Sequence, residues 1–300
     1  MTPDVSIPWN GVYSPVQEAD LLRVQLPTHH ETSPIRTTSI AEVKALIQHH
    51  THPHKAPGHD LLTGTVLKEL SPKDYRAITQ IYNAVLRLRY FPRDWKMGHI
   101  IMIAKPGKNP NDVTSYRPIS LLPLPSKVLE KILLRRILPL LEENGVIPKH
   151  QFGFRPKHGT IEQAHRLVHA ILDDFEHLRY GTAAFLDISQ AFDKVWHPGL
   201  WAKIQRILPL ALYTLLTSYL SGRQFWVKYR GTYTPCYVIY SGVPQGNILG
   251  PILYSIYAAD IPVMDTTLIA TYADDTAILA SHVDPVQAAE LLQHLRILET

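Results

Sequence analysis

Two adjacent acidic residues, Asp274 and Asp275, interrupt the apolar segment "ATYADDTAIL". In a continuous strand, successive side chains point to opposite faces, so one of the two carboxylates would face a core. An ionised carboxylate there costs on the order of several kcal/mol unless it is paired or binds a cation. A hairpin with its tip at the two aspartates lowers this cost, because both carboxylates can then face one small volume.

A third acidic residue, Asp187, lies in the middle of the segment "TAAFLDIS", which is typical of a buried strand. After it, the sequence predicts a helix that starts near Pro198 and a hairpin with its turn near Gly231. A Gly-Pro turn then leads into a helix for which Asn247 is a suitable N-cap. A strand–helix–hairpin order brings separated strands side by side. If the strand of Asp187 pairs with the hairpin of Asp274 and Asp275, the three carboxylates meet at one edge of a sheet.

Three carboxylates at one edge would repel one another and raise each other's pKa values. A divalent cation removes this repulsion, and Mg²⁺ prefers a few carboxylates together with water and substrate phosphates. The alternative is structural: Asp187 caps a backbone turn, and Asp274–Asp275 fills a hairpin turn, where Asp is common. Composition and spacing alone leave both interpretations open.

The charge of the chain is mildly basic, +4 overall, and unevenly distributed. Residues 87–157 contain 14 Lys or Arg against 5 Asp or Glu, whereas residues 258–300 contain one Arg against 7 acidic residues. This distribution suits a protein that binds a polyanion with one part and metal ions with another. Basic stretches that are simply solvated would produce the same pattern.

The first half of the chain has a recognisable order of elements. Residues 1–35 are rich in Pro and Thr and are predicted to be a linker or the tail of an upstream region. Ser39, with Glu42 three residues later, predicts a helix start. Helical patterns follow near residues 74–90 and 125–143, and between them "GHIIMIAKPGK" predicts a short strand ending in a Pro-Gly turn.

Several classes of protein are disfavoured by the sequence. No apolar run reaches the roughly 18 residues needed to cross a bilayer, and the polar start of the chain is unlike a signal peptide. The single cysteine, Cys236, allows no internal disulfide and suits a reducing compartment. We therefore expect a soluble intracellular protein with no membrane partner. The histidines in "HHTHPHKAPGHD" are predicted to lie in a solvated loop, because their spacing matches no zinc motif.

Five motifs and one further short segment, which follow one another along the chain with family-like spacing, resemble one family. "FLDISQAFDKVWH", "SGVPQGNILGPILYSIY" and "TYADDTAIL" are similar to the A, B and C motifs of reverse transcriptases. "KPGKNPNDVTSYRPISLLP" and "QFGFRPKHGT" are similar to the finger motifs of non-LTR (LINE-type) retrotransposon polymerases, and "KAPGHD" to the start of their polymerase region. The resemblance covers about residues 54–280, and the jockey-like insect group is the nearest match that we expect.

The resemblance implies an α+β fold of the right-hand polymerase type. We expect fingers over residues 36–180 and a palm over residues 181–300, with a βαββ-type antiparallel palm sheet. In this family further palm motifs and a helical thumb follow, so the chain is expected to be a fragment with an incomplete palm and without the thumb. Such a fragment is expected to be nearly inactive by itself.

The resemblance also assigns roles at the three acidic positions. Asp187, Asp274 and Asp275 would be catalytic, with Asp187, Asp274 and the backbone carbonyl of Ile188 as metal ligands. Two Mg²⁺ ions would serve as cofactors, and Mn²⁺ could replace them. Asp275 would contribute to activity with a less direct contact to metal.

Other motif positions imply contacts with nucleotide and template. Phe192 would exclude the 2′-hydroxyl of a ribonucleotide, although a core aromatic residue after a strand is the structural alternative. Asn247 stands where the family usually has Ser, and it caps a helix equally well. The nucleotide-binding set is Lys105, Arg117, Phe192, Gln245 and Gly246, and the template-binding set is Arg155 and Lys157.

The function implied is RNA-directed DNA polymerisation, in which a primer 3′-hydroxyl attacks a dNTP on an RNA template by a two-metal mechanism. The partners would be an RNA template, a DNA primer and dNTPs, in the nucleus by family resemblance or in the cytoplasm. A decayed or domesticated copy that binds nucleic acid without catalysis is the alternative. A viral RNA-directed RNA polymerase fits less well, because those enzymes usually have Gly before the paired aspartates.

Overall fold

The computed structural model describes residues 33–52, 55–112, 115–229 and 231–292. They form two compact units, each built from separated stretches of the chain. One unit contains described residues within 33–146 and 190–256, and the other contains residues 147–189 and 257–292. Most of the predicted linker over residues 1–35, and one histidine of the loop, His54, lie outside the described residues.

The first unit is mainly helical. Its elements are α2 (Ile40–His50), α3 (Gly64–Lys68), α4 (Pro72–Leu88), the 3₁₀ turn η1 (Arg93–Lys96), α5 (Leu124–Glu143), α7 (His197–Ile207), α8 (Leu210–Leu220) and α9 (Gly250–Tyr257). Ser39 is the N-cap of α2, where its side chain accepts a bond from the Glu42 amide, so the predicted helix start is confirmed. The predicted helices near 74–90, 125–143 and Pro198 are confirmed as α4, α5 and α7.

These helices pack through apolar faces that recur at helical spacing. In α2, Val43, Leu46 and Ile47 are fully buried, and the helix lies against α4 and α5. Tyr82 of α4 and Leu129 of α5 are also fully buried. Burial of large apolar side chains at this depth contributes roughly 1.5–3 kcal/mol for each residue, which makes this cluster the core of the unit.

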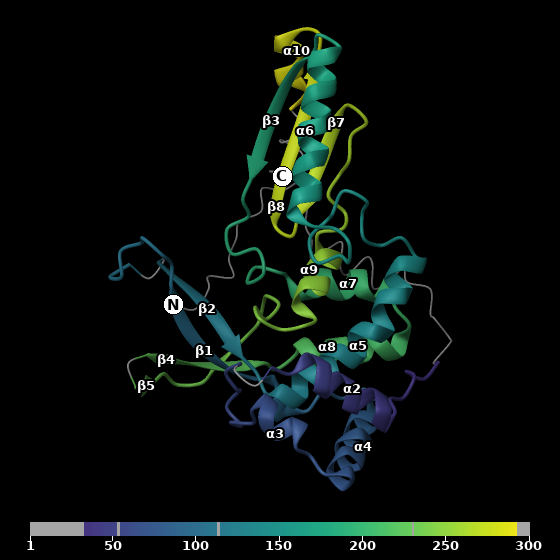
Figure 1. Cartoon of the computed structure of the whole chain (residues 1–300), viewed down its shortest axis with the longest axis vertical. Helices are drawn as coiled ribbons and strands as arrows, with labels where there is room; N and C mark the ends of the chain where they lie inside the picture. Colours follow the sequence, from purple (N-terminus) through teal and green to yellow (C-terminus); the bar gives the residue numbers. More distant parts are fainter. Residues whose placement is uncertain (1–32, 53–54, 113–114, 230, 293–300) are drawn as a thin grey trace. The chain divides into compact units, whose positions relative to one another are not determined.

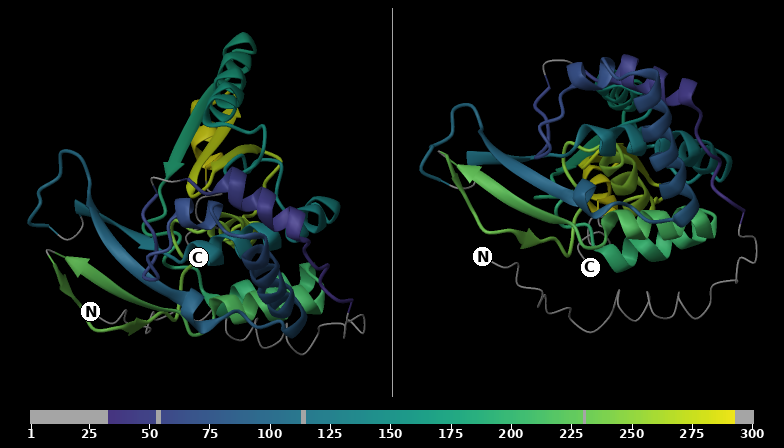
Figure 2. Two further views of the ribbon diagram at one scale, coloured as in Figure 1. Left: turned by 60° about the horizontal axis from the view of Figure 1, so that its bottom comes forward. Right: turned by 90° about the horizontal axis from the view of Figure 1, so that it is seen from below.

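The same unit carries a mixed sheet. Its strands are β1 (Met97–Ala104), β2 (Tyr116–Leu121), β4 (Gln224–Tyr229), β5 (Thr232–Tyr233) and β6 (Tyr237–Val238). β1 pairs antiparallel with β2 and parallel with β4, and β4 also pairs with β5 and β6. The predicted strand before the Pro-Gly turn and the hairpin near Gly231 are confirmed. In Figure 2, the blue strands β1 and β2 and the green strands β4 and β5 lie side by side and extend beyond the helices of this unit.

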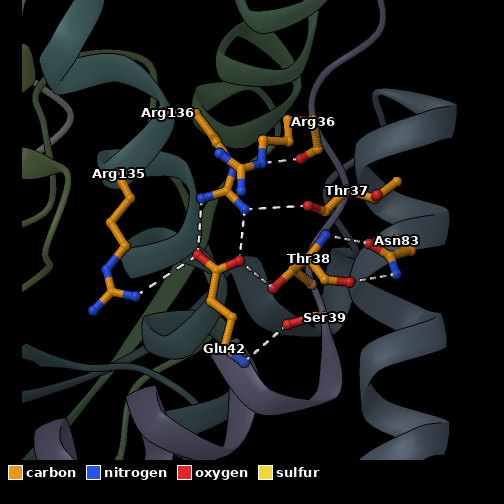
Figure 3. A network of polar contacts seen from close by, with 8 residues as sticks. All are labelled: Arg36, Thr37, Thr38, Ser39, Glu42, Asn83, Arg135 and Arg136. Atoms are coloured by element: carbon orange, nitrogen blue, oxygen red, sulfur yellow. Dashed lines mark hydrogen bonds and ion pairs between the residues drawn. The ribbon is translucent and has the colours of Figure 1, made fainter.

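A network of polar contacts connects α2 and the segment before it to α4 and α5 (Figure 3). The guanidinium of Arg136 on α5 donates to both carboxylate oxygens of Glu42, at 2.8 and 2.7 Å. Thr38 donates to the same carboxylate, and its backbone pairs in both directions with the Asn83 side chain of α4. The hydrogen bonds from Arg136 hold the pKa of Glu42 at about 2, well below its usual value.

We expect Glu42→Gln to lower the free energy of unfolding at neutral pH by about 2 kcal/mol, because charge-assisted hydrogen bonds are lost. A carboxyl whose pKa is depressed in the folded state stabilises the protein above its unfolded pKa, and this contribution disappears as the pH falls through the folded pKa. The difference between wild type and variant should therefore shrink between pH 4.5 and 2. Denaturant unfolding over this range measures it.

Glu143→Gln is the matched control, since Glu143 is an exposed acid near the end of α5 in the same unit. This change should alter the unfolding free energy by less than about 0.5 kcal/mol. A Glu42→Gln variant as stable as wild type at pH 7 would show that the network contributes nothing to folding.

The second unit is a three-stranded antiparallel sheet with two helices. The strands β3 (Tyr180–Leu186), β7 (Thr267–Tyr272) and β8 (Asp275–His282) have the order β3-β8-β7. The helix α6 (Thr160–Glu176) contacts β3 and β7, and α10 (Pro285–Leu291) contacts β3 and β8 (Figure 1). The helix α10 begins at Pro285 after an N-cap by Asp284, whose side chain accepts from the backbone N–H of Val286.

The predicted α+β class is confirmed, since both units combine helices with sheets. The helices in the described part of the chain are all too short or too polar to cross a bilayer.

Candidate functional site

The three acidic residues meet at one end of the three-stranded sheet. β7 and β8 are joined by a two-residue turn whose second residue is Asp274, and Asp275 is the first residue of β8. β3 pairs antiparallel with β8 so that its last residue, Leu186, lies opposite Thr276. Asp187 follows Leu186 directly and therefore emerges beside Asp275. The predicted pairing of the Asp187 strand with the aspartate hairpin is confirmed.

The setting of Asp187 differs from the prediction in two ways. The strand was expected to be buried with Asp187 in its middle, but β3 ends at Leu186 and Asp187 is exposed. Phe185 is 77% exposed, and exposed and half-buried residues alternate along β3. The physical reason is that β3 is the edge strand of the sheet, so an apolar run does not by itself indicate burial on both faces.

The negative charges of Asp187, Asp274 and Asp275 influence one another at this end of the sheet, the acidic corner. Burial raises the pKa of Asp274, and the negative charges of Asp275 and Asp187 raise it further, while its own backbone N–H opposes this. Asp275, like Asp187, is exposed. A cation would relieve the repulsion between a half-buried carboxyl and neighbouring negative charges.

The donors at this corner fit the preferences of a divalent metal ion. Mg²⁺ commonly takes one or two carboxylates and completes its coordination with water and substrate phosphates. Asp187 and Asp274 are carboxylates of this kind, and Ile188, whose backbone carbonyl is the predicted third ligand, follows Asp187 directly in the chain. Across the described residues, no group of three His, Cys, Asp or Glu side chains is close enough to hold a metal by itself.

The two basic residues predicted to bind triphosphate lie on the β1–β2 pair. Arg117 is exposed on β2 and lies opposite Ile103 of β1. Lys105 follows β1 directly, and its backbone N–H donates to the Ser115 carbonyl at 2.7 Å. Both residues therefore sit near the turn that connects the two strands.

Phe192 lies after the segment that contains Asp187 and packs on an aromatic ring. Its ring stacks on Tyr254 of α9 with 4.7 Å between centroids and 20° between planes. Its carbonyl accepts from the backbone N–H of Val243 at 2.8 Å, which ties it to the turn before α9. The ring is half-buried, so part of it remains accessible in this unit.

The turn over residues 242–249 depends on two glycines. Gly242 and Gly246 have φ values of 86° and 88°, which residues with a side chain rarely adopt. A Cβ added at Gly242 would lie 2.7 Å from the carbonyl oxygen of Asp193, so this position also requires close approach of backbone. Gln245 is half-buried, and its Nε2 lies 3.4 Å from both carboxylate oxygens of Asp193.

Asn247 is not the N-cap of a helix, so this prediction is wrong. The helix α9 begins three residues later, at Gly250. The side chain of Asn247 is buried instead, and its Nδ2 donates to the Tyr219 hydroxyl at 2.7 Å. The Asn247 side chain therefore binds the buried hydroxyl of Tyr219 on α8 instead of capping the helix.

The backbone before α9 is bound by Glu130, a residue that the sequence analysis missed. Glu130 is a fully buried residue of α5, and its Oε2 accepts from the N–H groups of Ile248 and Leu249 at 2.8 and 3.2 Å. Burial raises its pKa, although the charge of the buried Arg223 and the two backbone donors lower it. A signal was present, because Glu130 lies at helical spacing from the apolar residues Leu133 and Leu134.

The predicted template-binding residues lie in the loop before α6. Arg155 is half-buried and donates through Nη1 to the carbonyls of Pro148 and Gln151, both at 3.2 Å. Lys157 is exposed and has a φ of 62°. Both belong to the unit that contains the three acids, whereas the five predicted nucleotide-binding residues belong to the other unit.

Comparison with known proteins shows which family this chain is similar to. A family model described as reverse transcriptase (RNA-dependent DNA polymerase) matches residues 103–300. An RNA-directed DNA polymerase from mobile element jockey of Drosophila melanogaster is 45% identical over 268 residues, covering 87% of this chain and 29% of that protein. The "Probable RNA-directed DNA polymerase from transposon X-element" of the same species is 45% identical over 250 residues, covering 82% of this chain and 27% of that protein.

A jockey polymerase from Drosophila funebris is also 45% identical, over 87% of this chain. The chain spans 27–29% of the length of these relatives. The family match contains β2, α6 and all three strands of the sheet that carries the acidic residues. This chain belongs to the reverse transcriptase family, with close homologues among the RNA-directed DNA polymerases of non-LTR retrotransposons.

Proposed function

We propose that this chain is the part of a non-LTR retrotransposon polymerase that carries out RNA-directed DNA synthesis. The observation that carries the proposal is the meeting of Asp187, Asp274 and Asp275 at one end of an antiparallel sheet. Within a reverse transcriptase family member, that corner is the best candidate for the centre at which a primer 3′-hydroxyl attacks a dNTP.

In this proposal, Asp187, Asp274 and the carbonyl of Ile188 hold divalent metal, and Asp275 adds negative charge beside them. When bound, Mg²⁺ stabilises negative charge on the reacting phosphate oxygens. The protein contributes alignment and charge neutralisation, because phosphoryl transfer needs little covalent chemistry from side chains. We also infer that the sheet of β3, β8 and β7 belongs to a palm and the β1–β2 pair to fingers.

The other predicted residues would bind the reactants. Arg117 and Lys105 would neutralise the triphosphate, since the guanidinium can bind phosphate oxygens bidentately and the ammonium acts as a point charge. Gln245 and Gly246 would lie along the incoming nucleotide near the primer terminus, and Phe192 would face its sugar. Arg155 and Lys157 would contact the template backbone. The expected partners are an RNA template, a DNA primer and dNTPs.

The direct test is primer extension by the purified protein on an RNA template with dNTPs. Extension that depends on the template sequence supports the proposal. Because the chain spans only 27–29% of the length of its relatives, the same assay is run with a protein that covers their full length. Tight binding of the template–primer duplex by that longer protein without any extension, in Mg²⁺ or Mn²⁺, would favour a copy that only binds nucleic acid.

Arg117→Ala should raise the KM for dNTP by about tenfold, as expected when one charge-assisted phosphate contact is lost. The affinity for template–primer should stay nearly unchanged. If Arg117 instead contacts a template phosphate, nucleic-acid binding should weaken and the slope of its salt dependence should fall by about one. Titrations at two salt concentrations, combined with steady-state kinetics, separate these outcomes.

Arg206→Ala serves as the control for this prediction, because Arg206 is an exposed arginine of α7 in the same unit. It should change neither the KM nor the salt slope. A changed slope for Arg117→Ala with an unchanged KM would contradict the assignment.

A further inference from the structure

The side chain of Gln151 binds the peptide of Ala273, the residue immediately before Asp274. Gln151 opens the segment "QFGFR" and is 4% exposed. Its Nε2 donates to the Ala273 carbonyl at 3.0 Å, and its Oε1 accepts from the Ala273 N–H at 3.0 Å. The same Oε1 accepts from the Gly153 N–H at 2.7 Å. The amide of one side chain therefore satisfies both polar backbone groups of the turn residue.

Ala273 is the residue of this turn that most needs such support. Its φ is 59°, in the left-handed region that a residue with a side chain rarely adopts. Conformations of this kind persist only where the surroundings hold them in place. Because Ala273 precedes Asp274, its backbone angles set the direction in which the Asp274 carboxylate leaves the sheet.

The segment that carries Gln151 is itself firmly attached to the sheet. The Thr271 N–H donates to the His150 carbonyl at 3.0 Å, and the Phe152 N–H donates to the Thr271 carbonyl at 2.9 Å. The buried Gln163 side chain donates to the same two carbonyls, at 2.8 and 3.0 Å. Gln151 therefore lies in a segment, residues 150–153, that is hydrogen-bonded to β7 and to Gln163. This segment is called the platform.

Gly153 permits the close approach between this platform and the turn. A Cβ at this position would lie 2.2 Å from the Ala273 nitrogen, a distance that real Cβ atoms do not show. The platform and the aspartate turn are therefore fitted to each other through backbone and through one side-chain amide.

We propose that Gln151 is a positioning residue that fixes the aspartate turn and thereby the direction of the Asp274 carboxylate. The inference rests on the proposed function of Asp274 in nucleotide addition, but the contacts themselves do not depend on it. Gln151 touches no reacting group. It acts through the peptide of Ala273.

Gln151→Met is the informative variant, because it keeps a side chain of similar length and removes all three hydrogen bonds. We expect hydrogen exchange at the amides of Ala273 and Gly153 to accelerate by about tenfold or more, the size of effect expected from losing buried hydrogen bonds. We expect kcat for single-nucleotide addition to fall by about tenfold to a hundredfold, the cost of misplaced reacting groups. The KM for dNTP should change little, since the predicted triphosphate-binding residues lie elsewhere.

Gln163→Met is the matched control. It removes bonds from the same platform but none from Ala273, so exchange at Ala273 and kcat should change much less than in Gln151→Met. Equal effects of the two variants would mean that Gln151 only stabilises the platform, and the proposal would be overturned.

A measurement on the unmutated protein keeps the proposal testable if Gln151→Met does not fold. The amides of Ala273 and Gly153 should then exchange as slowly as those of Thr271 and Phe152, which lie in backbone hydrogen bonds. Fast exchange at Ala273 and Gly153 would overturn the proposal. If the exchange results are as expected while Asp274→Asn remains active, the proposed function fails and the positioning contact stands.

Discussion

Asp187→Asn and Asp274→Asn should each lower kcat for RNA-templated dNTP addition by at least about a hundredfold, because the carboxylates that would hold the catalytic metal are neutralised. Asp187 directly follows β3, Asp274 lies in the turn between β7 and β8, and both lie at the same end of the sheet, so their losses should be similar in size. Chelation of divalent cations should abolish the activity of the wild-type protein. Steady-state single-nucleotide primer extension measures all three effects.

The control for this prediction is Asp265→Asn. Asp265 is an exposed acid in the turn before β7 of the same unit, and its replacement should leave the rate of extension nearly unchanged. Circular dichroism and thermal unfolding establish that each variant is folded. Extension by Asp187→Asn or Asp274→Asn at a rate close to that of wild type would remove that residue from the catalytic centre.

Phe192→Val should increase the ratio of ribonucleotide to deoxyribonucleotide incorporation by about tenfold or more, the range in which pocket shape discriminates small groups. The half-buried ring packs on Tyr254, which fixes its plane and leaves part of it accessible. If this accessible part lies under the sugar of the incoming nucleotide, it leaves no room for a 2′-hydroxyl. Single-nucleotide kinetics with matched dNTP and rNTP on one template gives the ratio.

Phe225→Val is the comparison variant, since Phe225 is another half-buried ring of the same unit, packed against Tyr237 on the β4 side of the sheet. Its ratio should match that of wild type. An unchanged ratio in a folded Phe192→Val variant would make Phe192 a packing residue without a role in sugar selection.

The sequence was sufficient to predict the pairing that brings the acids together. An acidic pair inside an apolar run can be accommodated at a hairpin tip, and strand–helix–hairpin order then places the Asp187 strand beside the hairpin. The helices α4 and α5 were also predictable from apolar spacing and from the start signals of helices. In these cases the local pattern and the tertiary packing favour the same structure.

The errors arose where tertiary partners decide the outcome. The exposure of β3 follows from its place at the edge of the sheet, which its apolar composition does not reveal. Asn247 has the right residue type for an N-cap, but a hydroxyl 28 positions earlier in the chain binds it instead. The contacts of Glu130 reach residues more than a hundred positions away, so no local pattern could identify its partners.

The positive φ of Ala273 is a further feature that could not be predicted from the sequence. Gly, Asn or Asp would be the usual residue at a left-handed position, and an alanine gives no signal of this kind. Its conformation becomes understandable only when the side chain of Gln151, 122 positions earlier, is seen to bind both of its backbone groups.

The most direct test of the proposed centre is cleavage of the backbone by Fe²⁺ bound in place of Mg²⁺, with hydrogen peroxide as the oxidant, ascorbate returning Fe³⁺ to Fe²⁺, and mass spectrometry locating the cuts. The account predicts cuts in two separate segments, at residues 186–188 and 273–275, that Mg²⁺ suppresses and that Asp274→Asn abolishes. Cuts elsewhere in the chain, with neither segment cleaved in a protein that extends primers, would contradict it.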